Sequence, residues 1–273
     1  MVTPDGVSVA VQDWAAPRDA GGRPDVVLLH GFSQSHQSWL HQVAGDLARE
    51  FRLVTYDLRG HGASDKPEDK LFYQDGRRWA DELQTVIEHT GMQRPVVVAW
   101  SYAGRIALDY LSLYGDESLS GLAMVDATSS TDAQVMGPAA PLLRLMCDPD
   151  PEINVRATRE FLGACVARPL PPEEMEFMLE YNLAVPARIR ANLRRPPARY
   201  DAVLRGLRLP TLVLHGALDP VNLPGMAAYT AGLVRDSELL IYDDVAHTPF
   251  WEAPGRFDAD LADFVRRATD WRS

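Results

Sequence analysis

Cysteine is scarce in this chain of 273 residues, which contains only Cys147 and Cys165. The two lack the spacing of metal-ligand motifs, and neither has a histidine nearby in the sequence. We therefore expect both thiols to be reduced and to fill apolar space, as is typical of a cytosolic protein. The sequence predicts neither a disulfide nor a metal site.

Long hydrophobic runs and an excess of basic residues are also missing. No apolar run is long enough to span a bilayer, and Met1–Gly6 has neither the basic nor the apolar region of a secretory leader. Arginine and lysine together number 27 against 38 acidic residues, a formal net charge of −11 that disfavours binding to nucleic acid. We expect a cytoplasmic protein that binds neither membranes nor nucleic acid.

What the chain does contain is enough apolar material, 46% of its residues, to bury a full core in one large domain. Continuous apolar runs predict strands buried on both faces, and Val7, Val9 and Val11 alternate with polar residues as in an antiparallel strand. Helical spacing between the runs is typical of a doubly wound, mostly parallel α/β sheet. The expected strands are 25–30, 53–57, 96–100, 122–126, 211–216 and 239–243, and the expected helices are 39–50, 74–90, 102–113 and 254–269.

The alternation of strands and helices stops after Asp126 and resumes at Thr211. Between them the sequence shows only short amphipathic helical pieces separated by prolines. We therefore predict an α/β core formed by 1–126 and 208–273, with an inserted all-helical cap at 127–207. Ligands of open α/β sheets bind beyond the carboxyl ends of the strands, so the cap is expected to cover that edge.

The most informative segment is Val96–Gly104, in which an apolar, β-branched run ends abruptly at Ser101 and helical spacing follows at once. A serine hydroxyl is a weak nucleophile at neutral pH unless it is held rigidly beside a base. A sharp turn from strand to helix holds such a side chain clear of the sheet, with the helix N-terminus pointing at it. The segment therefore predicts a hydrolase with Ser101 as its nucleophile.

A candidate acid and a candidate base follow in the chain. Asp219 and His247 each lie just beyond a predicted strand. Because the carboxyl ends of parallel strands share one edge of the sheet, both side chains can meet Ser101 there. His247 would take the hydroxyl proton, and Asp219 would orient the imidazole. Asp126 is the rival acid, and Asp219 could instead only begin a turn.

With these motifs in this order, the chain resembles the α/β-hydrolase fold family over essentially its whole length. The resemblance implies an oxyanion hole formed by the backbone N–H groups of Phe32 and Tyr102, with no metal and no cofactor. The sequence departs from the family pattern at Ala99 and Ala103, because glycine usually occupies both positions around the serine. The matching segments are His30–Phe32, Asp57–Gly62, the turn at Ser101, Gly216 with Asp219, and His247.

The substrate pocket is the part of the site that the sequence defines least. Trp100 flanks the nucleophile and could line the acyl pocket, and Met136 and Leu142 of the cap are further candidates. Arginines cluster near the end of the cap, and we expect a solvated helix face there rather than a carboxylate-binding site. The cluster comprises Arg188, Arg190, Arg194, Arg195 and Arg199.

A serine nucleophile, rather than the aspartate of halide-displacing and epoxide-opening relatives, implies an acyl-enzyme intermediate. We expect a serine carboxylesterase that acts on small to medium, uncharged, apolar substrates, with a small-molecule ester or lactone as its partner. Hydrolysis of enol-lactones or of carbon–carbon bonds, and cofactor-free perhydrolysis of the non-haem haloperoxidase type, would use the same residues. A ligand-binding receptor with a vestigial triad is the alternative outside enzymology, and the sequence leaves the oligomeric state open.

Overall fold

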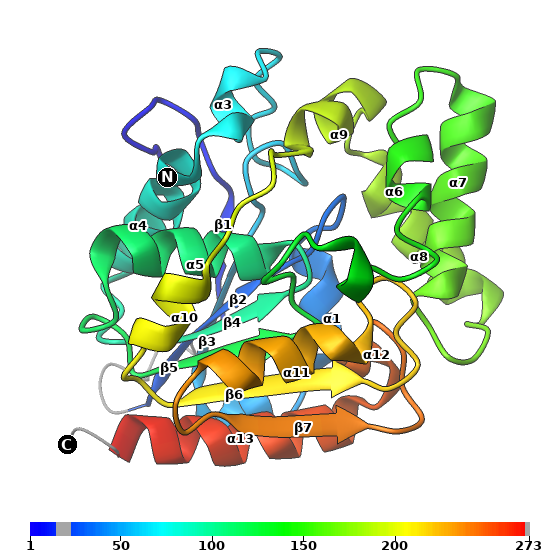
Figure 1. Ribbon diagram of the computed structural model, residues 1–273. Coiled ribbons are helices and arrows are strands. Elements are labelled where there is room, and N and C mark those ends of the chain that lie inside the picture. Colours follow the sequence, from blue (N-terminus) through cyan, green and yellow to red (C-terminus); the bar gives the residue numbers. More distant parts are fainter. Residues whose placement is uncertain (15–22, 271–273) are drawn as a thin grey trace.

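The computed structural model describes residues 1–14 and 23–270. Their strands form one seven-stranded sheet in the order β1-β3-β2-β4-β5-β6-β7, in which β1 runs antiparallel to β3 and all other pairs are parallel (Figure 1). This arrangement confirms the α/β class expected from the sequence. The strands are β1 (Val11–Asp13), β2 (Asp25–Leu29), β3 (Arg52–Tyr56), β4 (Val96–Trp100), β5 (Gly121–Val125), β6 (Thr211–Gly216) and β7 (Glu238–Tyr242).

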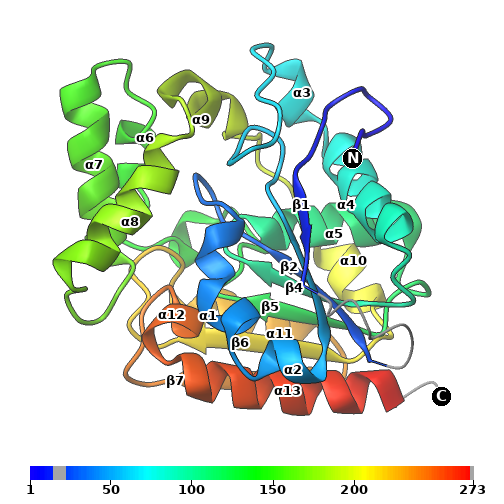
Figure 2. The same ribbon diagram turned by 180° about the vertical axis from the view of Figure 1, so that it is seen from behind.

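Helices cover both faces of the sheet, as two opposite views show (Figures 1 and 2). On the face seen in Figure 1 lie α4 (Gly76–Thr90), α5 (Ala103–Tyr114), α10 (Asp201–Gly206) and α11 (Pro224–Leu233). On the other face lie η1 (His36–Trp39), α1 (Leu40–Ala44), α2 (Leu47–Glu50), α12 (Pro249–Glu252) and α13 (Pro254–Asp270). The remaining helices are α3 (Leu71–Gln74), η2 (Ala133–Val135), α6 (Leu142–Leu145), α7 (Pro151–Ala164), α8 (Pro172–Leu183) and α9 (Ala187–Leu193).

Two apolar cores, one on each face of the sheet, explain why the central strands are hydrophobic throughout. Successive side chains of a strand point to opposite faces, so Leu28 packs into one core and Leu29 into the other. Both side chains are fully buried. Burial on both faces removes the polar alternation of a half-exposed sheet, which is why the continuous apolar runs predicted these strands.

The helix expected over 39–50 is broken in the structure. Helices α1 and α2 are separate because Gly45, between them, adopts an extended conformation. A Cβ atom at this position would lie only 2.7 Å from the carbonyl oxygen of His41. The N-terminal strand is also shorter than expected, since Val7 and Val9 are buried but only β1 pairs with β3.

Between β5 and β6 the chain leaves the sheet, and in the ranges that the structure describes it contributes only helices there. Figure 1 places α6, α7, α8 and α9 beyond the carboxyl ends of the strands, whereas α10 lies back beside α5. An isolated bridge between Met136 and Asn222 ties the start of this segment to the loop after β6. The boundaries of a cap at 127 and 207 stay a prediction.

None of the helices in residues 1–14 and 23–270 is long and apolar enough to cross a membrane.

Candidate functional site

Ser101 lies at the sharp turn between β4 and α5. Its φ is 54°, a left-handed conformation that residues other than glycine rarely adopt. The Ser101 N–H donates to the Val125 carbonyl at 3.0 Å, and the Ser101 carbonyl accepts from Gly104 N–H at 3.0 Å and Thr128 N–H at 2.9 Å. These backbone hydrogen bonds hold the strained turn and fix the hydroxyl at the carboxyl edge of the sheet.

The close approach that this turn demands occurs at Gly104 rather than at the flanking alanines. A Cβ on Gly104 would lie 2.8 Å from the Cβ of Ala127 and 3.0 Å from the backbone nitrogen of Thr128. Ala99 and Ala103 are fully buried and fit within the core. The family pattern places its glycines at positions 99 and 103 and therefore does not identify Gly104. A glycine inside a helical pattern does indicate close packing.

His247 connects the serine to a carboxylate. Its Nε2 lies 2.9 Å from Ser101 Oγ, and its Nδ1 lies 2.7 Å from Asp219 Oδ2. Asp219 and His247 are almost completely buried, with exposed fractions of 2% and 1%. When Nδ1 donates its proton to the carboxylate, Nε2 is left as the acceptor for the serine proton. The fold thus brings together the three side chains that the sequence singled out.

Backbone contacts hold the acid and the base in place. Asp219 Oδ1 accepts the N–H of Val221 at 2.7 Å and that of the next residue at 3.1 Å, so Asp219 also caps the turn in which it lies. The His247 N–H donates to the Cys165 carbonyl at 2.9 Å, and the His247 carbonyl accepts from Trp100 Nε1 at 2.8 Å. The turn-forming and orienting roles of Asp219 are compatible, because each uses a different carboxylate oxygen.

Asp126, the rival acid, lies next to Asp219 and makes no hydrogen bond to His247 among the residues described. Its Oδ1 accepts the Gly216 N–H at 2.9 Å, and its Oδ2 is buried without a partner. Burial, together with the neighbouring Asp219 carboxylate, raises the pKa of Asp126 well above its usual range. A neutral carboxyl offers no charge to stabilise an imidazolium, so the geometry favours Asp219 as the acid.

Asp126, His215 and Asp219 also place one possible metal-ligand atom each within 4.8 Å of one another. His215 Nε2 lies 2.9 Å from the Asn222 carbonyl oxygen, and burial lowers the pKa of His215. Asp219 is already engaged by His247. Because His215 and Asp219 already have these partners, we interpret the cluster as the surroundings of the acid Asp219. The absence of a resident metal stays a prediction.

Replacing Asp126 with asparagine is expected to stabilise the protein at neutral pH. In the unfolded chain this carboxyl ionises above about pH 4, whereas in the folded protein its raised pKa moves the ionisation to higher pH. Folding the native protein therefore costs about 1.4 kcal/mol more for each pH unit between those two pKa values. An asparagine avoids this cost and keeps an oxygen for the Gly216 N–H.

Urea unfolding of both proteins at about pH 5 and about pH 8 checks this expectation. The free energy of unfolding of Asp126→Asn should exceed that of the native chain at the higher pH, and the gap should narrow at the lower pH. A difference in the free energy of unfolding that does not grow from about pH 5 to about pH 8 would contradict the raised pKa of Asp126.

Phe32 and Tyr102 are the two residues whose backbone N–H groups the sequence predicts to form an oxyanion hole. Both residues line the same pocket as the serine, and neither N–H donates to another group of the described chain. Most backbone donors in a folded protein have a partner, and unused ones are what a developing oxyanion requires. Tyr102 is also the cap residue of α5, whose N-terminal dipole adds positive potential.

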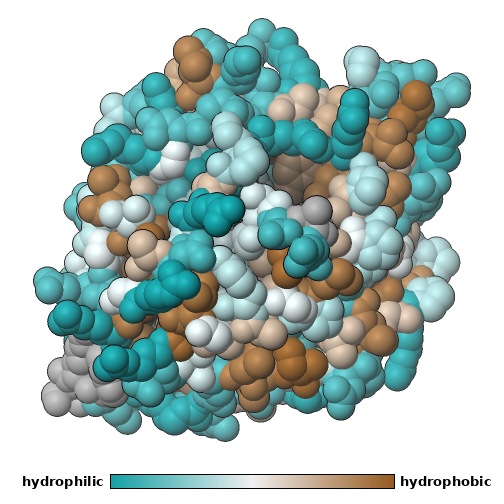
Figure 3. Space-filling view, viewed as in Figure 1, coloured by the Kyte–Doolittle hydropathy of each residue, from teal (hydrophilic) through white to brown (hydrophobic). Residues whose placement is uncertain are grey.

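The pocket in front of Ser101 has a volume of about 330 Å³. Figure 3 shows a hollow with hydrophobic atoms at its base, at the place that lies below α9 in Figure 1. Trp100 and Met136, two of the residues expected from the sequence, line the pocket. The expectation for Leu142 is wrong, because Leu143 lines the pocket and Leu142 does not. Neighbouring helical residues point about 100° apart, so only one of these two leucines reaches the pocket, although both pack against the core.

The arginine cluster at the end of the cap is only in part the solvated face that the sequence predicted, because Arg188, Arg194 and Arg199 are exposed whereas Arg190 and Arg195 are covered. Arg190 is 1% exposed and donates to the carbonyl groups of Met146 and Asn182, and burial lowers its pKa to about 10. The Arg195 side chain is 4% exposed and forms an ion pair with Asp109. Arg190 lies within α9 and Arg195 lies beyond its end. The local spacing of the arginines cannot show that neighbouring segments cover their side chains.

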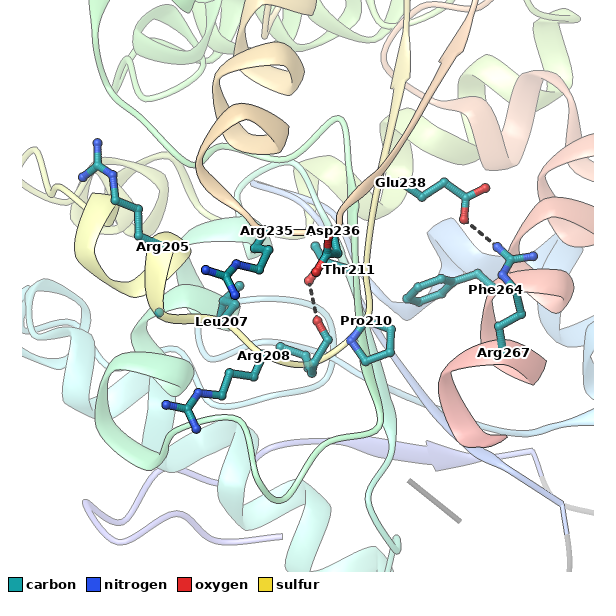
Figure 4. A pocket seen from close by; sticks show the side chains of 12 residues that line it. Arg205, Leu207, Arg208, Pro210, Thr211, Arg235, Asp236, Glu238, Phe264 and Arg267 are labelled. Carbon is teal, nitrogen blue, oxygen red and sulfur yellow. Dashed lines mark hydrogen bonds and ion pairs between the residues drawn. The ribbon is translucent and has the colours of Figure 1, made fainter. Parts of the chain in front are cut away.

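A second and larger hollow, of about 840 Å³, lies at the amino ends of β6 and β7 (Figure 4). Figure 4 shows Arg267 reaching Glu238 within it. The residues that line it include no serine, cysteine or histidine. Ligands of open α/β sheets bind at the opposite, carboxyl edge, so the pocket at Ser101 is the candidate site of chemistry.

Known proteins with similar sequences and structures include several esterases. A sequence profile of the alpha/beta hydrolase fold matches residues 24–146. The structure superposes with a TM-score of 0.92 on a protein assigned as an aryl esterase from Burkholderia cenocepacia, which is 32% identical with 98% of both chains covered. The TM-score is 0.87 for the esterase RhEst1 from Rhodococcus sp. ECU1013, also 32% identical with 97% of both chains covered. The bifunctional esterase/perhydrolase DCH of Acinetobacter calcoaceticus is 25% identical over 97% of this chain and 99% of its own.

Proposed function

Because the chain belongs to the α/β-hydrolase fold family, we propose that it is a serine carboxylesterase with Ser101 as its nucleophile. It hydrolyses carboxylic esters of small molecules, in line with its esterase-named relatives. The observation that carries the proposal is the hydrogen-bonded chain from Ser101 Oγ through the His247 ring to Asp219. A serine linked in this way has a base for its proton and an orienting acid behind that base.

Acylation begins when Ser101 Oγ attacks the carbonyl carbon of the ester while His247 Nε2 takes the hydroxyl proton. The carbonyl oxygen becomes an oxyanion and accepts the free N–H groups of Phe32 and Tyr102, each typically worth about 3 kcal/mol in the transition state. As the intermediate collapses, the ester C–O bond breaks and the departing oxygen takes the proton from His247. Asp219 stabilises the imidazolium throughout this step.

Deacylation repeats the sequence with water as the nucleophile. His247 takes a proton from the water as its oxygen attacks the acyl carbon, and the same two N–H groups bind the second oxyanion. The bond from Ser101 Oγ to the acyl carbon then breaks, the serine recovers its proton from His247, and a carboxylic acid leaves. Both half-reactions use the same base and the same pair of N–H donors. Ser101, His247, Asp219 and these two donors therefore suffice for the whole cycle.

We assign segment 127–207 as the cap that shapes the substrate pocket. Apolar side chains from this segment line the pocket beside the nucleophile, among them Met136, Leu143 and Phe161. A lining of this kind favours small to medium apolar acyl or alcohol groups. A cytoplasmic location remains a proposal from the sequence.

A panel of substrates tests the ester specificity. Purified enzyme is assayed with p-nitrophenyl acetate and butyrate, an enol-lactone, a vinylogous diketone, and acetate with hydrogen peroxide. We expect the highest kcat/KM on the simple esters. Perhydrolysis is the second candidate, because one relative carries both activities, and peroxide-dependent formation of peracid would reveal it. A higher kcat/KM on the lactone or on the diketone would replace the esterase assignment with that alternative.

Labelling with a fluorophosphonate separates an enzyme from a ligand-binding receptor. A serine that a base activates attacks the phosphorus and displaces fluoride, so mass spectrometry should find one adduct on the peptide that contains Ser101. Prior incubation with a slowly hydrolysed ester should protect that peptide. An intact protein that gains no adduct would contradict the proposed catalytic role of Ser101.

A further inference from the structure

Building on the proposed esterase function, we propose that the pocket selects esters that carry a carboxylate away from the scissile bond, and that Arg105 receives this carboxylate. The sequence alone predicts an uncharged substrate. Two features of the pocket change that expectation, namely the sign of the charges that line it and the buried donors that lack a partner.

The arginine, lysine, aspartate and glutamate side chains that line the pocket are all positively charged. Arg105, Arg194 and Arg195 form part of its wall, and no aspartate or glutamate does. The chain as a whole has 38 acidic residues against 27 basic ones, so composition does not explain a wall with only cations. A recess lined by one sign of charge concentrates ligands of the opposite sign.

Arg105 is the buried arginine of this wall that has no carboxylate partner among the described residues. It lies on α5, four residues beyond Ser101, and is 6% exposed. Within the described residues its Nη2 donates to the Pro196 carbonyl at 2.6 Å, no carboxylate lies within ion-pair distance, and its Nε is buried without a partner. A guanidinium has five N–H donors, and an unpaired charge in a buried position is costly. A carboxylate in the pocket would supply the missing acceptors.

Arg195 adds a second buried positive charge to this wall of the pocket. Its Nη2 lies 2.6 Å from Asp109 Oδ2, while its Nε and Nη1 are buried without partners. Asp109 also accepts the Tyr200 hydroxyl at 2.8 Å. In the described part of the chain the Asp109 carboxylate therefore pairs with Arg195 alone, and the unpaired Arg105 leaves a net positive charge at this wall of the pocket.

A purely structural role for Arg105 is the competing explanation. The segment between α9 and α10 crosses over α5 in Figure 1, and the bond from Arg105 to Pro196 fastens it there. The Tyr102 hydroxyl, which donates to the Leu193 carbonyl at 3.0 Å, fastens it as well. This role uses one of the five donors of Arg105. It also predicts no dependence of activity on the charge of the substrate, so experiment can separate the two explanations.

The rest of the lining limits the chemistry of the anion. Apolar side chains, including Met136, Phe161 and Val221, contribute to the same pocket. A carboxylate joined to the ester by a hydrocarbon chain fits both the apolar side chains and the arginine wall of the pocket. Guanidinium binds carboxylate through paired N–H donors. The carboxylate could belong to the acyl part, as in a monoester of a dicarboxylic acid, or to the alcohol part, as in an acetylated hydroxy acid.

The test compares charged and neutral esters of equal length. Monomethyl esters of the dicarboxylic acids from succinate to suberate are assayed against methyl esters of the matching monocarboxylic acids, with acid release followed in a pH-stat. Acetylated hydroxy acids and the corresponding alkyl acetates form the second arm. We expect kcat/KM for the anionic member of the best pair to exceed that of its neutral partner by about 10- to 100-fold, and the better arm identifies which part carries the charge.

Variants assign the preference to Arg105. Arg105→Met should bring the ratio of anionic to neutral kcat/KM close to one, whereas Arg105→Lys should keep part of the preference. The matched control is Arg188→Met, since Arg188 is exposed and pairs with Glu68 outside the pocket, and it should leave the ratio unchanged. The ratio is measured within one protein, so a loss of folded enzyme does not disturb it.

The possible outcomes separate this inference from the proposed function. If no ester of either charge is hydrolysed, the esterase assignment fails. If p-nitrophenyl acetate and the neutral methyl esters are hydrolysed as well as the anionic ones, the esterase assignment stands and the carboxylate preference is wrong. A strong preference that survives in Arg105→Met would contradict the assignment of the carboxylate to Arg105.

Discussion

Replacing Ser101 with alanine is expected to lower kcat on p-nitrophenyl acetate by on the order of 10⁵- to 10⁶-fold. The substitution removes the oxygen that forms the acyl-enzyme, while the other groups of the site remain. His247 and the donors of Phe32 and Tyr102 would then support only slow attack by water. The fold should be unaffected, because the hydrogen bonds that hold the turn come from the backbone of Ser101.

The measurement is kcat in a discontinuous assay with the fluorophosphonate label as a second readout, together with the melting temperature. Ser120→Ala is a matched control, since Ser120 is also a nearly buried serine but lies next to the amino end of β5. It should keep native activity and native labelling. If Ser101→Ala retained activity within tenfold of the native enzyme, another residue would have to be the nucleophile.

Replacing Asp219 with asparagine is expected to lower kcat by on the order of 10³- to 10⁴-fold. The Asp219 carboxylate accepts a hydrogen bond from His247 Nδ1 at 2.7 Å. An asparagine can present its amide N–H₂ instead, which favours the tautomer with the proton on Nε2, and that tautomer cannot take the proton of Ser101. The amide also has no negative charge to stabilise the imidazolium.

Asp126→Asn is the matched control for the acid, because it makes the same chemical change on the neighbouring carboxyl. We expect its kcat to stay within a few-fold of the native value, since Asp126 makes no hydrogen bond to His247 in the described structure. Steady-state assays on both variants and circular dichroism of each distinguish lost catalysis from lost folding. Equal losses of kcat in the two variants would mean that the carboxyls act as one unit.

The sequence by itself determined the α/β class and the order of the site residues. The central strands lie under helices on both faces, so their burial appears in the sequence as unbroken apolar runs. Ser101, Asp219 and His247 could be found because each directly follows such a run or lies in the loop just beyond it. Parallel strands then bring their carboxyl ends to one edge, whatever the distance along the chain.

Only the tertiary structure decided between candidate residues that occupy similar places in the sequence pattern. Asp126 and Asp219 both follow strands, and three-dimensional geometry alone shows which of them contacts His247. Leu143 rather than Leu142 lines the pocket, although both pack against the core. Arg105 and Gly104 face a linker and a loop from distant parts of the chain, and local periodicity carries no information about contacts between segments that are far apart in sequence.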